Sequence, residues 1–176
     1  MRVDGRVGAG QAGSGATACR VDLVIGRRDG AVAGNILAVL AAPPPRAVAL
    51  LVRTPIGDMV RPATTMVNQT PIDGAVMDHY LRGAAQLGVA EAIDGAVASR
   101  SIPPNRLQDL TLLVVVALSP DLSLEPVSWP AEERIRQSAR MATSHAIQEA
   151  LEGLSLAGVV AGTARSAFGD AATVTP

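Results

Sequence analysis

The sequence contains no lysine and very few aromatic residues. All 15 basic residues are arginine, and 16 acidic residues bring the formal net charge to -1. Without lysine, the chain has no side-chain amine for Schiff-base chemistry and no lysine for a Walker-type phosphate loop. One tyrosine, one tryptophan and one phenylalanine offer no stacking platform for single-stranded nucleic acid. Because a phosphate-backbone binder would also carry a basic excess, we expect no nucleic-acid partner.

Cysteine and histidine are almost as scarce as the aromatic residues. The single cysteine, Cys19, excludes an internal disulfide and a multi-cysteine metal site. His79 and His145 are far apart in the sequence and form no HExxH motif, so we predict no metal centre. The segment Met1–Arg6 lacks the apolar core of a secretory signal, and no apolar run is long enough to cross a bilayer. We therefore expect a cytoplasmic protein with no membrane partner.

What the chain does contain is alanine, glycine and enough apolar surface for one core. Of its 176 residues, 48% are hydrophobic, which suits a single domain over residues 1–153. Residues 154–176 are mostly small and are interpreted as a C-terminal tail. Residues 8–18, rich in glycine and alanine, are interpreted as a flexible connection.

Hydrophobic periodicity and turn residues predict the remaining elements. The segment Leu110–Leu118 is the clearest strand, and Pro130–Gly153 is a long helix with glycine at its end. A second long helix is expected to begin at Thr70-Pro71, to be interrupted by glycines, and to end before Pro103. The other predictions are a helix over Ala31–Ala42 and strands over Arg20–Gly26, Ala47–Arg53 and Arg61–Asn68. This order predicts a two-layer α/β sandwich, with a mixed sheet and both long helices on one face.

No short motif identifies a reaction, but two groups of polar residues stand out. Arg20 and Asp22 share one face of a strand, because side chains alternate along a strand. Gln86 lies between two glycines in an apolar helical stretch, where a close backbone approach by another chain or a ligand is possible. An exposed glutamine at a helix kink explains Gln86 equally well. Cys19 falls on the face opposite Arg20 and is expected to be a small buried apolar residue.

The other charged residues and the two histidines favour a structural interpretation. Neither His79 nor His145 has an evident catalytic partner in the sequence, so each is expected to be a partly exposed helix residue. Three glutamates and three arginines at helical spacing predict solvated helix faces: Glu132, Glu133, Glu149, Arg134, Arg136 and Arg140.

Several stretches, in the same order, resemble the formaldehyde-activating enzyme family, which condenses formaldehyde with tetrahydromethanopterin. The first is GSGATACRVDLVIG, at Gly13–Gly26. The others are RPATTMVNQTPI (61–72), RGAAQLGVAEAIDGAVASRSIP (82–103), DLTLLVVVAL (109–118) and ATSHAIQEALEG (142–153). The resemblance implies a fold like that of ribosomal protein S5 domain 2. It also implies a homopentamer, with a pterin bound as substrate at subunit interfaces and no covalent cofactor.

The resemblance also implies which residues would touch the pterin, and the match is mixed. Asp22, Leu51 and Gln86 stand where the family has the same residues at its pterin contacts. The family's catalytic histidine, its proton donor, is replaced by Arg20. Three further departures are Gln69 in place of a lysine, Pro71 in place of a threonine, and Leu87 in place of a second histidine.

The replacement at Arg20 changes the expected chemistry. A general acid needs a pKa near the working pH, whereas the pKa of an arginine lies far above that range and its proton is not released. We therefore expect a protein that binds a tetrahydropterin or related one-carbon ligand, with weak or absent formaldehyde condensation. The alternatives are an active lyase of the family type and a non-catalytic subunit that assembles with an active paralogue.

Overall fold

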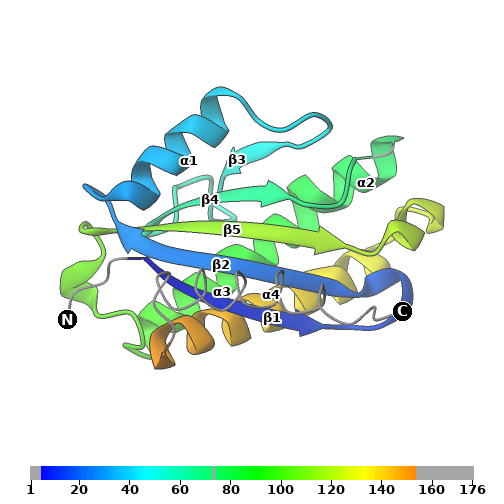
Figure 1. Cartoon of the computed structure of the whole chain (residues 1–176). Helices are drawn as coiled ribbons and strands as arrows, with labels where there is room; N and C mark the ends of the chain where they lie inside the picture. Colours follow the sequence, from blue (N-terminus) through cyan, green and yellow to red (C-terminus); the bar gives the residue numbers. More distant parts are fainter. Residues whose placement is uncertain (1–4, 73, 154–176) are drawn as a thin grey trace, which may run out of the picture.

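The computed structural model describes residues 5–72 and 74–153, which form one mixed β-sheet with helices (Figure 1). The α/β class predicted from the sequence is confirmed, whereas the more specific likeness to ribosomal protein S5 domain 2 stays a prediction. The strands are β1 (Arg6–Ala12), β2 (Cys19–Arg27), β3 (Ala49–Leu51), β4 (Ala63–Asn68) and β5 (Leu110–Leu118). The helices are α1 (Ala31–Ala41), α2 (Gly74–Tyr80), α3 (Gln86–Ala98) and α4 (Trp129–Glu152), with a π-helical turn at Leu81–Ala85 between α2 and α3.

The sheet has the strand order β1-β2-β5-β4-β3. The pairs β1–β2, β2–β5 and β3–β4 are antiparallel, and β4–β5 is parallel. The central strand β5 contains no charged residue and alternates buried with half-buried positions along most of its length. A strand of this kind has one face in the core and the other partly open to solvent.

The core lies between the sheet and the layer formed by α2, the π turn, α3 and α4. From β2, the alternate residues Cys19, Val21, Leu23 and Ile25 point into it and are at most 3% exposed. Glycines allow the layers to come very close. A Cβ added at Gly10 of β1 would lie 2.0 Å from the Ala142 carbonyl oxygen of α4. Both long helices therefore cover the same face, as the sequence predicts.

The short helix α1 lies on the other face of the sheet. Gly26 belongs to the alternate set of β2 positions, and a Cβ added there would lie 2.4 Å from the Val32 side chain of α1. The helix covers only part of this face, which we call the open face. The side chains of Arg20, Asp22 and Val24 lie on it.

Two sequence interpretations are wrong. Residues 8–18 are not a flexible connection, because β1 occupies Arg6–Ala12 and pairs with β2 along its whole length. Its small residues reflect the close contact with α4 and not chain flexibility. The second long helix begins at Gly74, not at Thr70-Pro71. The Thr70 hydroxyl does not cap it, since it donates to the Leu118 carbonyl oxygen at 2.7 Å. The predicted tail, 154–176, lies outside the described residues.

Candidate functional site

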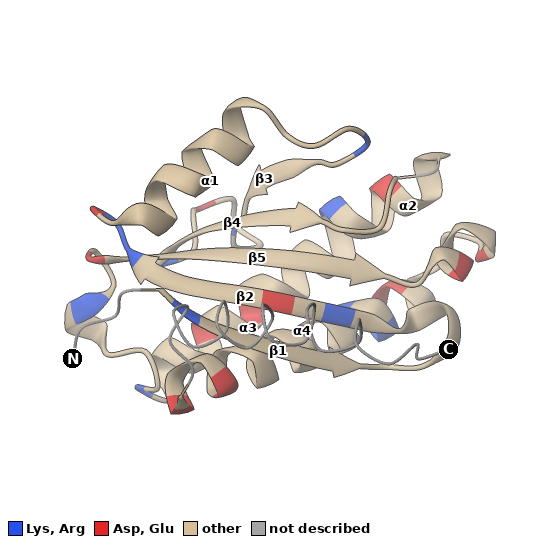
Figure 2. Ribbon diagram, in the orientation of Figure 1, with Lys and Arg blue, Asp and Glu red and all other residues tan. Residues whose placement is uncertain are grey.

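The open face carries charge at only one central strand. In Figure 2, β4 and β5 have no charged residue, whereas β2 carries residues of both signs. Arg20 pairs in register with Ala117 of β5, and Asp22 pairs with Val115. Two neighbouring charged side chains therefore stand beside an apolar strand.

Arg20 and Asp22 form an ion pair on this face. The Arg20 Nη2 and Nε atoms both donate to Oδ1 of Asp22, at 3.0 and 3.3 Å. The other carboxylate oxygen, Oδ2, accepts no hydrogen bond from the described residues. The side chains remain 61% and 37% exposed, so the pair contributes little to stability. Asp22 thus keeps one free acceptor, and its charge is balanced by a group that cannot release a proton.

An apolar hollow of about 380 Å³ lies on the same face beside β4 and β5. Gln69 and Pro71, just beyond the end of β4, line one side of it, and Val115 lines its floor. Since Val115 is the register partner of Asp22, the hollow and the ion pair lie on adjacent strands. The structure therefore brings Arg20, Asp22, Gln69 and Pro71 to one region of the open face, which we call the half-site.

Asn68, which sequence reasoning missed, holds the segment that carries Gln69 and Pro71. It is only 6% exposed, and its Oδ1 accepts the Val48 backbone N–H. Its Nδ2 donates to the Thr70 carbonyl oxygen at 2.6 Å. A buried amide with both ends hydrogen-bonded fixes a loop, because leaving either end unpaired costs free energy. An asparagine at the end of an apolar strand was the available sequence signal.

Leu51 lies on the open face but at the edge of the sheet. It belongs to β3, is 38% exposed and pairs with Thr65 of β4. Strands β5 and β4 separate it from Asp22 on β2. Three strand spacings correspond to about 14 Å. Leu51 and Asp22 therefore face the same side without being in contact.

Gln86 lies on the opposite side of the sheet from the half-site. It is the first residue of α3 in the helical layer, directly after the π turn, and is half-buried. Its side-chain amide has no hydrogen-bond partner among the described residues. The sheet itself separates it from Arg20 and Asp22, so one copy of the chain cannot bring all six predicted residues together.

The two glycines that flank Gln86 have different environments. A Cβ added at Gly88 would lie 2.2 Å from the Arg136 carbonyl oxygen, so Gly88 is needed for packing of α3 on α4. Gly83, in the π turn, is exposed, and an added Cβ would meet nothing within 4 Å. Packing within the chain therefore explains Gly88 and leaves Gly83 unexplained. Single π turns inside helices are frequent at functional sites.

Cys19 and His79 have structural surroundings. Cys19 is 3% exposed, and burial raises the pKa of its thiol to about 12, so it is not a nucleophile near neutral pH. His79 is half-exposed, with Nε2 at 2.7 Å from Oε1 of Glu132, and this contact joins α2 to α4. The prediction that His79 is a partly exposed helix residue is confirmed. Its partner, Glu132, was expected only to lie on a solvated helix face.

The remaining predicted helix charges are partly confirmed. Arg136 bonds Glu133 of its own helix and also Glu91 of α3, at 2.6 Å. Glu149 instead accepts the backbone N–H of Ala9, which ties α4 to the edge strand β1. Its role was missed because β1 was not predicted.

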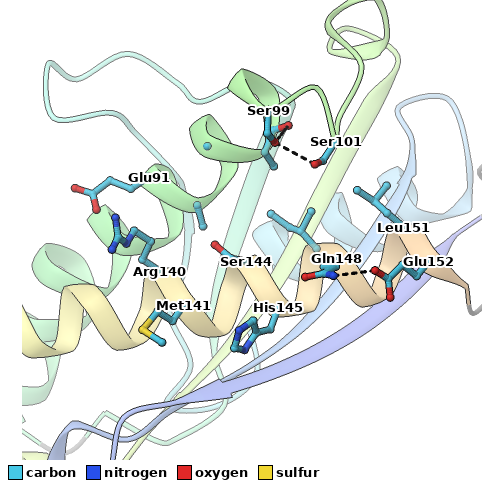
Figure 3. Close-up of a pocket in the computed structure, with 14 residues that line it drawn as sticks. Glu91, Ser99, Ser101, Arg140, Met141, Ser144, His145, Gln148, Leu151 and Glu152 are labelled. Carbon is cyan, nitrogen blue, oxygen red and sulfur yellow. Dashed lines mark hydrogen bonds between the residues drawn. The ribbon is translucent and has the colours of Figure 1, made fainter.

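A hollow of about 740 Å³ forms a groove between α3 and α4. None of the predicted site residues lines it. Its polar groups partly pair with one another, as Ser99 with Ser101 and Gln148 with Glu152 (Figure 3). His145 is exposed at its rim, as predicted for a helix residue, and lies in the helical layer away from the half-site. The groove shows no convergence of acid, base and binding groups.

The described residues contain neither a metal-binding cluster nor a helix that could span a membrane. No group of three or more His, Cys, Asp or Glu side chains is placed to hold a metal ion. No helix in 5–72 or 74–153 is both long and apolar enough to cross a membrane.

The fold and the half-site together define an α/β protein that carries an ion pair and an apolar hollow on the open face of its mixed sheet. Comparison with known proteins gives the family. The sequence model of the formaldehyde-activating enzyme family matches residues 7–168. The chain is 30% identical over 149 residues to the 5,6,7,8-tetrahydromethanopterin hydro-lyase of Methanosarcina barkeri, covering 84% of this chain and 79% of that relative. The chain belongs to the formaldehyde-activating enzyme family.

Proposed function

We propose that this chain binds a tetrahydropterin, tetrahydromethanopterin or a related one-carbon carrier, and that it condenses formaldehyde with it weakly or not at all. The observation that carries the proposal is the ion pair of Arg20 with Asp22. It puts a permanently protonated group where the family has its proton-donating histidine. The name of the relative, a tetrahydromethanopterin hydro-lyase, supports a pterin as the ligand.

Binding is supported by what the half-site retains. Asp22 offers Oδ2 as a free acceptor for a ligand N–H, and the apolar hollow beside it suits the flat face of a ring. Where the family has a lysine and a threonine, this chain has Gln69 and Pro71. A cation is therefore replaced by a neutral amide, and a hydroxyl by an apolar ring. We therefore expect contacts with the uncharged part of the ligand to be kept and contacts with an anionic part to be weakened.

Arg20 is unsuited to general acid catalysis of the condensation. Condensation of an aldehyde with an amine expels the aldehyde oxygen as water, which requires a proton delivered to that oxygen. The Arg20 guanidinium holds its proton at all working pH values and supplies only electrostatic polarisation. General acid catalysis is worth about 10²–10⁴-fold in rate, so a site without it is expected to fall by that factor.

An active lyase is the second candidate, favoured by the retained residues Asp22, Leu51 and Gln86. A direct assay distinguishes the two. The formation of methylene-tetrahydromethanopterin from formaldehyde and tetrahydromethanopterin is followed with and without the protein. We expect a rate close to the uncatalysed one, and a clear acceleration would contradict the proposal.

Ligand binding is tested separately by thermal unfolding. A ligand that binds only the folded chain raises its stability by RT ln(1 + [L]/Kd), so tetrahydromethanopterin at about 100 times its Kd adds about 2.7 kcal/mol. We expect a corresponding rise in melting temperature. No rise at saturating pterin would leave only the non-catalytic assembly subunit among the three alternatives.

The placement of Gln86 supports a ligand site shared between copies. The half-site lies on the open face, whereas Gln86 lies in the helical layer on the other side of the sheet. Bringing a Gln86 side chain to the half-site therefore requires the helical layer of a second copy to lie against the open face of the first. The homopentamer implied by the family resemblance would provide this arrangement. Native mass spectrometry tests it, and a monomer at all concentrations would contradict it.

A further inference from the structure

The apolar hollow beside β4 and β5 has a single charged residue in its lining, Arg46. It lies there beside Pro44 and Pro45, and none of the described residues that line the hollow is acidic. Arg46 is also the only charged residue between Ala31 and Val52. The loop from α1 to β3, which contains it, therefore shows blue but no red in Figure 2. A ligand in the hollow meets one positive charge among otherwise neutral groups.

The guanidinium of Arg46 is free to bind a ligand. The side chain is exposed, and its guanidinium makes no hydrogen bond or ion pair with any residue in 5–72 or 74–153. An arginine side chain presents planar N–H donors whose spacing matches two oxygens of a carboxylate or phosphate. Hydrogen bonds between such charged partners are stronger than those between neutral groups. Arg46 therefore offers the hollow a binding group for an oxyanion.

Arg46 occupies its place at a conformational cost. The Ala47 backbone N–H donates to the Pro44 carbonyl oxygen at 2.9 Å, which closes a four-residue turn with Arg46 as its third residue. The φ angle of Arg46 is +63°. A positive φ at the third residue is typical of a type II turn, where glycine or asparagine is preferred. The turn itself thus favours glycine, and residues held in such strained conformations are concentrated at ligand sites.

A second arginine with a positive φ, Arg100, provides a contrast. Its φ is +64°, and its backbone N–H donates to the Val97 carbonyl oxygen just after the end of α3. A left-handed residue directly after a helix is a common way for a helix to end. Arg100 is exposed and does not line the hollow. The helix end accounts for Arg100, whereas no helix ends at Arg46.

The surrounding chain holds the backbone of Arg46 in place. Its carbonyl oxygen accepts the Ile72 backbone N–H at 3.3 Å and a hydrogen bond from Nδ2 of Asn68 at 3.4 Å. Three consecutive prolines, at 43–45, precede it and restrict the backbone of the loop. Because the turn is fixed before a ligand arrives, little backbone entropy is lost on binding.

We propose that Arg46 is the anion-binding residue of the hollow, and that the ligand of this site is a flat ring that carries a carboxylate or a phosphate. The hollow, about 380 Å³, falls within the range of small-molecule sites, about 300–1,000 Å³. Its apolar walls accept the ring and Arg46 binds the oxyanion. The inference rests on the proposed function only in taking this hollow as the ligand surface. Gln69 offers no charge to an anionic part of the ligand, and Arg46 supplies that charge from the loop after α1.

Matched ligands test the class of ligand. 1-Naphthoate, 1-naphthyl phosphate and the uncharged 1-naphthalenemethanol present the same ring with three different groups, and their dissociation constants are measured by titration calorimetry. We expect both anions to bind at least about tenfold more tightly than the alcohol. The difference should shrink at high salt, because salt screens the attraction. The tighter of the two anions identifies the group that Arg46 binds. Equal affinities of the three ligands, or binding of none, would overturn the inference.

Two matched variants test the residue. Arg46→Gly and Arg100→Gly each remove an exposed arginine with a positive φ, so both should raise the melting temperature, by up to about 4 °C. Only Arg46→Gly should weaken binding of the two naphthyl anions, by about tenfold. Arg46→Lys keeps the charge and should keep most of the preference for anions. Equal anion binding by Arg46→Gly and the unmodified chain would overturn the assignment.

Two pterins separate this inference from the proposed function. Pterin-6-carboxylate and the uncharged 6-hydroxymethylpterin are titrated into the unmodified chain and into Arg46→Gly. We expect the carboxylate to bind more tightly to the unmodified chain, and the two pterins to bind equally to Arg46→Gly. If the naphthyl anions bind through Arg46 and neither pterin binds, the proposed function fails and the inference stands. If both pterins bind the unmodified chain equally, the inference fails and the proposed function stands.

Discussion

At the scale of one residue, the proposed function depends on the side chain of Arg20. Its two hydrogen bonds to a single oxygen of Asp22 keep the guanidinium on the open face, one strand away from the apolar hollow. Arginine and histidine are both cationic donors when protonated, but only histidine releases its proton near neutral pH. Under the proposed function, the step that Arg20 weakens is therefore proton transfer.

Replacing this residue tests that interpretation. Arg20→His introduces a titratable donor at the same place, and we expect the condensation rate to rise at least about tenfold above that of the unmodified chain. The rise should fade above about pH 6.5 as the imidazole loses its proton. The assay is the methylene-tetrahydromethanopterin assay, over a range of pH.

The control is Arg20→Gln, which removes the charge and the ion pair without adding a titratable proton. We expect it to behave like the unmodified chain. An equal gain in both variants would show that Arg20 only blocks the site and that the acid is not what is missing.

Cys19 provides a second test at the scale of one residue. Burial raises the pKa of the Cys19 thiol from about 9.0 in the unfolded chain to about 12 in the folded chain, so between these pH values the unfolded chain loses the thiol proton and the folded chain keeps it. Unfolding is then favoured as the pH rises, by about 1.4 kcal/mol per pH unit above 9. Between pH 8 and 10, the unmodified chain should lose about 1.4 kcal/mol more unfolding free energy than Cys19→Ala. The measurement is urea unfolding, and parallel losses in both proteins would refute it.

At the scale of elements, close approach of backbones decides how the layers pack. The edge strand β1 uses glycine against α4, and α3 uses Gly88 against the Arg136 carbonyl oxygen. A strand rich in small residues has little hydrophobic periodicity, so the sequence gives no strand signal where the structure has one. The same glycines that allow packing make the segment look like a linker.

The two helical glycines on either side of Gln86 make a matched pair. Gly88→Ala should destabilise the fold by about 1–3 kcal/mol, because its Cβ would overlap the backbone of α4. Gly83→Ala should be neutral or stabilising by up to about 1 kcal/mol, since its Cβ meets open space and alanine favours a helix. Chemical unfolding of the monomer measures both. A large loss of stability at Gly83 would mean that the π turn needs glycine for its own geometry.

At the scale of the whole molecule, the absence of lysine acquires a chemical consequence. A protein of this family is expected to meet formaldehyde, which adds readily to amines and thiolates. No lysine amine is present, and the one thiol is buried with a raised pKa. The side chains that react fastest with an aldehyde are therefore absent or protected.

We accordingly expect the chain to resist modification by formaldehyde. After incubation at millimolar formaldehyde, intact-mass spectrometry should show few adducts on the unmodified protein. The variant Arg134→Lys, at an exposed position of α4, should gain an adduct at the new amine. An equal adduct load on the two proteins would refute the expectation.

The fold class, the family and most of the helices and strands follow from the amino-acid sequence alone. Periodicity located Leu110–Leu118 and the helix that ends at Gly153, since long apolar repeats depend little on distant contacts. It also put Arg20 and Asp22 on one face, because alternation is a local property of a strand.

Contacts between distant parts of the chain, in contrast, are visible only in the folded structure. It turned the glycine-rich segment before Arg20 into an edge strand and gave Thr70 a partner on β5 in place of a capping role. It also put Gln86 behind the sheet, away from Asp22 and Leu51. Pairing of strands and packing of layers join residues far apart in the chain, and local patterns carry no record of those partners. The division of the predicted site residues between two surfaces follows from that arrangement, whereas a role for a second copy is also implied by the family resemblance.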